Sequence, residues 1–273
     1  MKKFLFLTDF SPASYNAFSY ALEIARILNA KLYVLHVQDH ITLLNEDNVY
    51  AEYEVYKQIV KSGILDNRDS EFYNRLNDSD FNADHLFFYL SSGHLVPEIT
   101  QFTNLYKTDL LILGLRTKSQ DMFKVLSTNT LNILGSTSVP LLCVPFSASY
   151  KTIRNLVFST TLSLEDDNAL QLFINYLNQL NASGTCVYVD NKKSEFINTL
   201  AQWHNKYSYA PLSNVILKGN DAAKLVVNYI KETYADVIVT VKSNQTFFDQ
   251  LFSANFTKDM LDEIEIPLLI LPK

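Results

Sequence analysis

The segment Val139-Pro-Leu-Leu-Cys-Val-Pro145 returns near the end of the chain as Ile266-Pro-Leu-Leu-Ile-Leu-Pro272. The two segments lie 127 positions apart, so their paired prolines share one offset. Two further pairs of landmarks keep this spacing to within one position: Asp109 with Asp236, and Gly93 with Gly219. Self-similarity at one fixed period is the signature of a repeated structural unit. The sequence therefore predicts two copies of one domain.

Each copy alternates short apolar runs with amphipathic stretches, which is the pattern of a parallel sheet with crossover helices. This predicts an α/β fold with two tandem open parallel five-stranded sheets flanked by helices, in domains at residues 1–147 and 151–273. Ser11 is expected at the N-cap of the first helix and Pro12 at its first position. The expected strands are 4–8, 31–37, 85–91, 110–114 and 141–144, and then 156–159, 185–189, 215–218, 237–241 and 268–271.

Composition narrows the functional classes. A hydrophobic fraction of 48% supports a folded core, and a formal net charge of −6 disfavours nucleic-acid binding. The apolar stretch at the amino terminus is too short for a signal peptide, and no run approaches the ~20 residues that span a bilayer. We therefore expect a cytoplasmic protein with no nucleic-acid or membrane partner. Cys143 and Cys186 lie in apolar runs and are expected to be buried free thiols.

The first copy carries an insertion. The interval from Val37 to Gly93 is 56 residues, whereas the interval from Val189 to Gly219 is 30. The extra residues lie within 39–84, and the end of this stretch, 66–84, is strongly polar. Two interpretations stay open: an elongated surface helix pair, or a lid or partner-docking surface near the carboxyl edge of the sheet.

A candidate anion loop follows the fourth expected strand. The strand ends in Gly114-Leu-Arg-Thr117, and Ser127-Thr128 opens the next helix after nine residues. A strand-end glycine permits close approach of a ligand, and the free N–H groups of a helix start can hold an anion. Arg116 adds positive charge beside this loop. Structural interpretations also stay open: Gly114 relieves crowding behind the strand, and Ser127-Thr128 is an ordinary helix cap.

Together these segments resemble the universal stress protein family, of the adenine nucleotide α-hydrolase-like superfamily. The resemblance rests on Phe-Leu-Thr-Asp-Phe-Ser at 6–11, Leu-His-Val at 35–37, the loop at 114–128 and the closing strand at 139–145. It implies Rossmann-like domains, the first of which binds an adenine nucleotide such as ATP with Mg²⁺. Asp9 would then meet the ribose, unless it caps a helix or turn, which Ser11 is already expected to do. The backbone of Val37 would meet the adenine, and the phosphates would be held by Gly114, Arg116, Thr117, Ser127 and Thr128.

The chain departs from the family loop G-x2-G-x9-G-[ST] at two positions. Thr117 and Ser127 replace glycines whose role is close backbone approach. The second domain departs further, with Thr160 expected in place of Asp9, Val241 in place of Gly114, and Ser253-Ala254 in place of Ser127-Thr128. This domain is predicted to bind no ligand.

Two functions fit these patterns. In the first, the protein is a stress-responsive regulator, and nucleotide in the first domain alters binding of an unidentified protein partner. In the second, it is a nucleotide-free interaction scaffold. The sequence has no nucleophile, P-loop or metal-ligand motif, so we expect no enzyme activity. Family members often dimerise through the fifth strand; the resemblance therefore implies an internal pairing of domain 1 with domain 2, and leaves a homodimer open.

Overall fold

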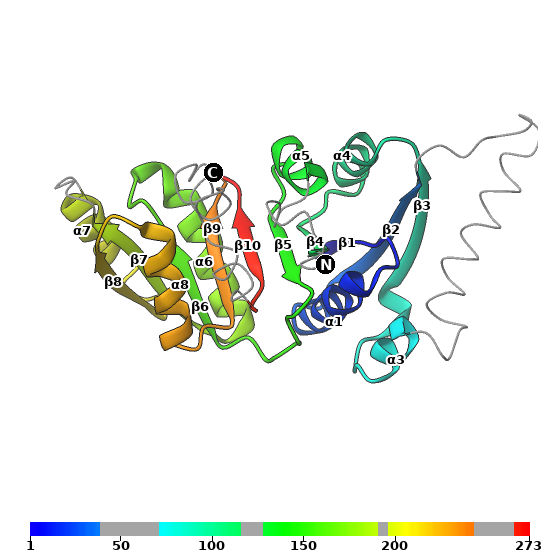
Figure 1. Cartoon of the computed structure of the whole chain (residues 1–273), viewed down its shortest axis with the longest axis horizontal. Helices are drawn as coiled ribbons and strands as arrows, with labels where there is room; N and C mark the ends of the chain where they lie inside the picture. Colours follow the sequence, from blue (N-terminus) through cyan, green and yellow to red (C-terminus); the bar gives the residue numbers. More distant parts are fainter. Residues whose placement is uncertain (39–70, 116–127, 191–195, 243–264) are drawn as a thin grey trace, which may run out of the picture. The chain divides into compact units, whose positions relative to one another are not determined.

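The computed structural model describes residues 1–38, 71–115, 128–190, 196–242 and 265–273. These residues form two compact units that divide in the sequence between Tyr150 and Lys151. Each unit is an open sheet of five parallel strands with helices packed against it (Figure 1). The predicted α/β architecture is confirmed.

The first unit contains β1 (Lys3–Leu7), α1 (Pro12–Ile27), β2 (Lys31–Gln38), α3 (Glu71–Asn77), the 3-10 helix η2 (Ala83–His85), β3 (Leu86–Ser92), α4 (Leu95–Tyr106), β4 (Leu110–Leu115), α5 (Thr128–Ser136) and β5 (Leu141–Pro145). Its strand order is β3-β2-β1-β4-β5. The chain moves outward from β1 to β3 and then crosses to β4 on the other side of β1. The strand order therefore reverses between β1 and β4, the kind of position where open parallel sheets bind ligands.

Aromatic side chains attach the helices to the two faces of this sheet. On one face, Phe6 of β1 contacts Phe72 of α3, with ring centroids 6.4 Å apart. Phe6 is level with Val34 of β2, so the neighbouring Tyr33 points to the other face. There Tyr33 contacts Phe102 of α4, with centroids 6.0 Å apart. Helices α1 and α3 thus cover one face and α4 covers the other (Figure 1).

The second unit contains β6 (Asn155–Ser159), the 3-10 helix η3 (Leu164–Asp166), α6 (Asp167–Leu180), β7 (Ser183–Asp190), α7 (Phe196–Lys206), β8 (Leu212–Lys218), α8 (Ala222–Glu232), β9 (Val237–Val241) and β10 (Leu268–Leu271). Its strand order is β10-β9-β6-β7-β8. With β6 in the place of β1, this is the order of the first sheet. Phe158 of β6 stacks on Phe173 of α6, with centroids 5.1 Å apart, as α1 packs on β1.

The repeated landmarks of the sequence have matching contacts in the two units. The carboxylate of Asp109 accepts a hydrogen bond from the N–H of Lys3 (2.8 Å), and that of Asp236 accepts one from the N–H of Asn155 (2.9 Å). Each acid therefore ties the start of the fourth strand of its unit to the start of the first. The paired prolines also act alike, since the carbonyls of Pro140 and Pro267 both accept from fourth-strand N–H groups.

Backbone conformation repeats as closely. Every described residue with a left-handed φ has a counterpart in the other unit: Phe10 with Leu162, Asn29 with Asn181, Gly93 with Gly219, and Lys107 with Tyr234. Such angles are uncommon outside glycine, so four coincident pairs are unexpected unless the backbone path is shared. The duplication is thus visible in the backbone as well as in the sequence.

Part of the predicted insertion is a helix packed on the first unit. Residues 39–70 lie outside the described residues, and the remainder forms α3 and η2. Helix α3 packs against α1 and buries Phe72, which is 3% exposed. A stretch that is strongly polar in sequence therefore supplies core residues, also including Leu76 and Phe81.

The two cysteines behave as predicted. Cys143 on β5 and Cys186 on β7 are buried free thiols, and burial raises the pKa of both.

None of the described helices has the length and apolarity to cross a bilayer.

We expect the hydroxyl of Thr240 on β9 to destabilise the second unit. The side chain is fully buried, and its Oγ1 has no hydrogen-bond partner among the described residues. We predict that Thr240→Val, which removes this hydroxyl, raises the free energy of unfolding by about 1 kcal/mol. Urea denaturation followed by the fluorescence of Trp203, which lies on α7 of the same unit, measures the change.

Thr185→Val is the matched control, because the Thr185 hydroxyl is hydrogen-bonded to Ser213 Oγ at 2.9 Å. This variant is expected to lower the denaturation midpoint. A midpoint that falls in Thr240→Val as well would contradict the prediction.

Candidate functional site

The loop from β1 to α1 lies at the carboxyl edge of the first sheet, beside the reversal of strand order. Asp9 Oδ1 accepts hydrogen bonds from the N–H of Ser11 (3.0 Å) and the hydroxyl of Ser14 (2.8 Å). Phe10 has a φ of 57°, and its N–H donates to Thr8 Oγ1 at 3.0 Å. The Asp9 carboxylate therefore joins the loop to the first turn of α1 while its side chain stays exposed.

Ser11 does not cap α1 with its side chain. It stands at the N-cap position and Pro12 follows at the start of the helix, as predicted, but no side-chain capping bond forms. The Ser11 hydroxyl is buried without a partner among the described residues. Asp9 accepts from the N–H of Ser11 and the hydroxyl of Ser14, so it has a structural role in the turn before α1. The alternative that Asp9 stabilises a turn is therefore supported, and its role toward a ribose stays a prediction.

Gly114 on β4 lies against the same turn of α1. A Cβ atom at this position would stand 2.3 Å from the carbonyl oxygen of Ala13 and 3.1 Å from the N of Ser14. Real Cβ atoms do not approach backbone so closely, so only glycine fits. The structural interpretation, relief of crowding, is therefore enough to explain why this residue is glycine. The group that approaches Gly114 is the backbone of α1.

The fold brings three predicted site residues to one edge of the sheet. Asp9 follows β1, Val37 is next to last in β2, and Gly114 lies near the end of β4. Because β1 pairs with both β2 and β4, these positions are neighbours across the carboxyl edge. The other predicted residues cannot be placed with them: Arg116, Thr117 and Ser127 lie outside the described residues, and Thr128 begins α5 without a described side chain.

Matching hydrogen bonds correct one predicted equivalence between the domains. The N–H of Leu162 donates to Thr160 Oγ1 at 2.9 Å, as that of Phe10 donates to Thr8 Oγ1. Thr160 is therefore the counterpart of Thr8, not of Asp9. The predicted match was one residue out because the first expected strand ran to Thr8, whereas β1 ends one residue earlier.

In the second unit the carboxylate and hydroxyl have exchanged places. Thr161 takes the position of Asp9, and Asp166 takes that of Ser14, five positions later in both units. Asp166 is 3% exposed and accepts hydrogen bonds from the N–H and hydroxyl of Thr161 (3.3 and 3.1 Å) and from the hydroxyl of Thr160 (2.9 Å). The exchange keeps the loop tied to the helix but leaves no acid at the strand end.

Val241 stands at the position of Gly114, as predicted, and is fully buried. It carries a side chain at the position where Gly114 lets the first turn of α1 approach. After β6, the first helical segment of the second unit is the 3-10 helix η3, and α6 starts only at Asp167. By position, Asp167 corresponds to Tyr15, three residues inside α1.

The family model described as the universal stress protein family matches residues 1–145, which is more than half of the chain. The chain belongs to the universal stress protein family. The comparison with curated proteins gives no match.

Several solved structures are similar to this chain, two of them over nearly its full length. A universal stress protein from Archaeoglobus fulgidus is 13% identical, covers 99% of this chain and 98% of its own, and has a TM-score of 0.71. A functionally unknown protein from Pseudomonas aeruginosa is 11% identical, with coverages of 100% and 92% and a TM-score of 0.60. A universal stress protein in complex with cAMP is 19% identical over 52% of this chain and 96% of its own, with a TM-score of 0.40. At these identities the first two comparisons support the tandem fold alone.

Ser14, which is hydrogen-bonded to Asp9, belongs to the candidate site and was not included in the sequence analysis. The available signal was an acid and a hydroxyl five residues apart in both domains, in opposite order. The spacing alone does not predict that the two side chains form a hydrogen bond, because that depends on the conformation of the loop.

We predict that Gly114→Ala destabilises the first domain by about 3 kcal/mol, since the added methyl overlaps the backbone of α1. Thermal unfolding followed by far-ultraviolet circular dichroism measures the loss, and Trp203 fluorescence reports whether the second domain is spared. Gly135→Ala on α5 is the control, because a Cβ there meets nothing within 4 Å. It should unfold at or above the wild-type temperature. Equal unfolding temperatures for Gly114→Ala and wild type would show that α1 does not need this glycine.

Proposed function

We propose that the first domain of this universal stress protein binds an adenine nucleotide at the carboxyl edge of its sheet. The observation that carries the proposal is the position of Asp9, an exposed carboxylate fixed by hydrogen bonds at the end of β1, beside the reversal of strand order. A carboxylate there suits the hydroxyls of a ribose, and the neighbouring end of β2 at Val37 offers backbone to a base. The exchange of acid and hydroxyl at Thr161 and Asp166 supports binding in the first domain and none in the second.

The phosphates would extend toward the loop that contains Thr117 and Ser127, where two glycines of the family pattern are absent. ATP with Mg²⁺ is the proposed ligand, and the phosphates themselves would hold most of the ion's coordination, as is usual for Mg²⁺. Side chains in place of glycine hinder close approach of phosphate, so we expect weak affinity.

We propose a regulatory role without a catalytic step for this binding, in the response to stress. Nucleotide at the Asp9 loop would change the surface offered to a protein partner. Helix α3 is a candidate for transmitting the change, because Phe72 contacts Phe10 of this loop, with ring centroids 5.9 Å apart. Cytoplasmic location, internal pairing of the domains through their fifth strands, and a homodimer stay predictions from the sequence and the resemblance.

A nucleotide-free scaffold is the second candidate, and one observation favours it. Gly114 is explained by the close approach of α1, and Asp9 is explained by its bonds to Ser11 and Ser14. Both residues would therefore be retained in a protein that had lost the ligand.

Calorimetric titration with ATP and Mg²⁺, after extraction of co-purified nucleotide, tests the proposal. We predict one site per chain, and affinity about tenfold weaker in Asp9→Ala because a charge-assisted hydrogen bond is lost. Thr161→Ala, the same position in the second domain, is the matched control and should bind as the wild type does. A wild-type protein without binding heat or thermal stabilisation would refute nucleotide binding and leave the scaffold.

A gain of function gives a second, independent test of the loop. Thr117→Gly with Ser127→Gly restores the family pattern and should tighten ATP binding by about tenfold if this loop holds phosphate. Binding of ADP and ATP should then diverge in affinity, whereas adenosine should be unaffected. Unchanged ATP affinity in the double variant would exclude the loop from the site.

A further inference from the structure

The side chain of His36, near the end of β2, joins the two strand ends that the proposed site uses. Its Nδ1 lies 2.7 Å from the carbonyl oxygen of Thr8, the residue before Asp9. A carbonyl oxygen only accepts, so Nδ1 carries a proton and donates this hydrogen bond, and the neutral imidazole is fixed as the Nδ1–H tautomer. Val37, whose backbone would meet the base, follows His36 directly in the chain. One side chain therefore ties the base end of the proposed site to its ribose end.

The imidazole also contacts the ring of Phe10, the residue after Asp9. The two ring centroids are 5.0 Å apart, with an angle of 51° between the ring planes. Strand register explains this contact. Val34 is level with Phe6, which faces α1 and α3, and His36 lies two residues further along β2 on the same face. His36 is therefore bonded to the residue before Asp9 and in contact with the residue after it.

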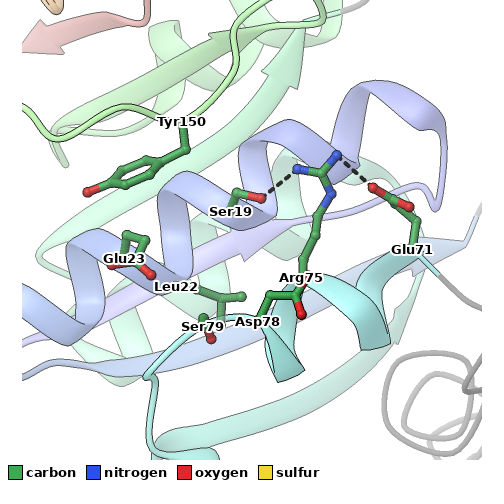
Figure 2. A pocket seen from close by; sticks show the side chains of 8 residues that line it. All are labelled: Ser19, Leu22, Glu23, Glu71, Arg75, Asp78, Ser79 and Tyr150. Carbon is green, nitrogen blue, oxygen red and sulfur yellow. Dashed lines mark hydrogen bonds and ion pairs between the residues drawn. The ribbon is translucent and has the colours of Figure 1, made fainter.

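Phe10 is held from helix α3 as well. Its ring contacts that of Phe72, with centroids 5.9 Å apart, and Phe72 is placed by the packing of α3 against α1. In that packing the guanidinium of Arg75 donates to Ser19 Oγ at 2.6 Å and pairs with Glu71 at 2.8 Å (Figure 2). The two ring contacts stabilise Phe10 in its left-handed conformation, with a φ of 57°, which is unfavourable for a residue with a side chain.

The second unit holds the corresponding loop in a different way. There Asp166, a buried carboxylate, accepts hydrogen bonds from two threonine hydroxyls of the loop. In the first unit the Asp9 side chain is exposed, so its position depends more on the backbone that carries it. Strand register places Tyr188 at the position of His36. The imidazole therefore belongs to the unit that presents an exposed acid, and a tyrosine takes its place where the acid is buried.

We propose that His36 is a positioning residue of the nucleotide site. Its hydrogen bond to Thr8 and its contact with Phe10 hold the backbone on both sides of Asp9, so that the carboxylate is presented to the ribose beside the end of β2. A group that is already held in its binding position loses less freedom when the ligand binds, and affinity rises accordingly. The inference rests on the proposed function, since its ligand is the nucleotide proposed for Asp9, and it requires no contact between His36 and that ligand.

Two substitutions of His36 separate its hydrogen bond from its ring contact, and calorimetric titration of the full chain with ATP and Mg²⁺ compares them. His36→Phe keeps a ring beside Phe10 but leaves the carbonyl of Thr8 without its donor, so we expect ATP binding about fivefold weaker. His36→Asn keeps an N–H close to the position of Nδ1 and should bind ATP within about twofold of the wild type. Tyr188→Phe, at the corresponding position of the second domain, is the matched control and should bind as the wild type does.

A double-mutant cycle distinguishes positioning from direct contact with the ligand. If His36 acts through Asp9, then His36→Phe should weaken ATP binding no further in a protein that already carries Asp9→Ala. A direct contact between His36 and the nucleotide would instead give losses that add.

Three results would overturn the positioning role while leaving nucleotide binding intact. The first is wild-type ATP affinity in His36→Phe, the second is equal weakening in His36→Phe and His36→Asn, and the third is additive losses in the cycle with Asp9→Ala. A wild-type protein that binds no ATP would refute the proposed function itself, and the positioning role with it, so the two failures are distinguishable.

The tautomer of His36 provides a check that needs neither a variant nor a ligand. Long-range ¹H–¹⁵N NMR of the wild-type protein, at a pH where the ring is neutral, should show the proton on Nδ1. A proton on Nε2 instead would exclude the hydrogen bond to Thr8 and overturn the proposal.

Discussion

The close contact between the end of β4 and the first turn of α1 determines how the helices and the β1–α1 loop of the first domain are placed. Gly114 permits it, because any side chain there would overlap the backbone at Ala13. With α1 starting directly on the sheet, Ser14 comes within reach of the Asp9 carboxylate, and the β1–α1 loop is fixed. The same placement of α1 creates the surface on which α3 packs through Phe72. A local packing constraint therefore positions both the candidate nucleotide edge and helix α3.

The second domain shows what changes when that contact is lost. Val241 replaces the glycine, the α-helix begins later, and the acid that ties loop to helix moves from the loop to the helix as Asp166. The loop geometry survives, because either partner of the pair can supply the carboxylate. What does not survive is an exposed acid at the strand end. The loop is stabilised by the hydrogen bond whichever residue supplies the carboxylate. The proposed ligand, in contrast, requires the carboxylate at the end of the first strand of the domain.

Periodicity and repeated landmarks were enough to predict the fold, since each of ten strands produces an apolar run and the two halves support one another. Details that depend on the path of a loop were not accessible. Ser11 matched the pattern of a cap and lies at the N-cap position, yet its hydroxyl makes no capping hydrogen bond. Thr160 was matched to the wrong residue because apolar runs do not define strand ends. Phe72 lies in a stretch that is polar in sequence, so the packing of α3 against α1 left no local pattern.

The left-handed residues record how the two halves diverged. Lys107 and Tyr234 share a backbone angle that costs a non-glycine residue about 1–2 kcal/mol, yet their side chains differ in charge and shape. Phe10 and Leu162 are both apolar, and Asn29 and Asn181 are identical, so the two halves differ in side chain at some of these positions and keep the torsion angle at all of them. Lys107 and Tyr234 lie next to helix ends, where glycine is the favoured residue. Glycine at either position would raise the free energy of unfolding, so the native sequence is not the most stable one for this backbone.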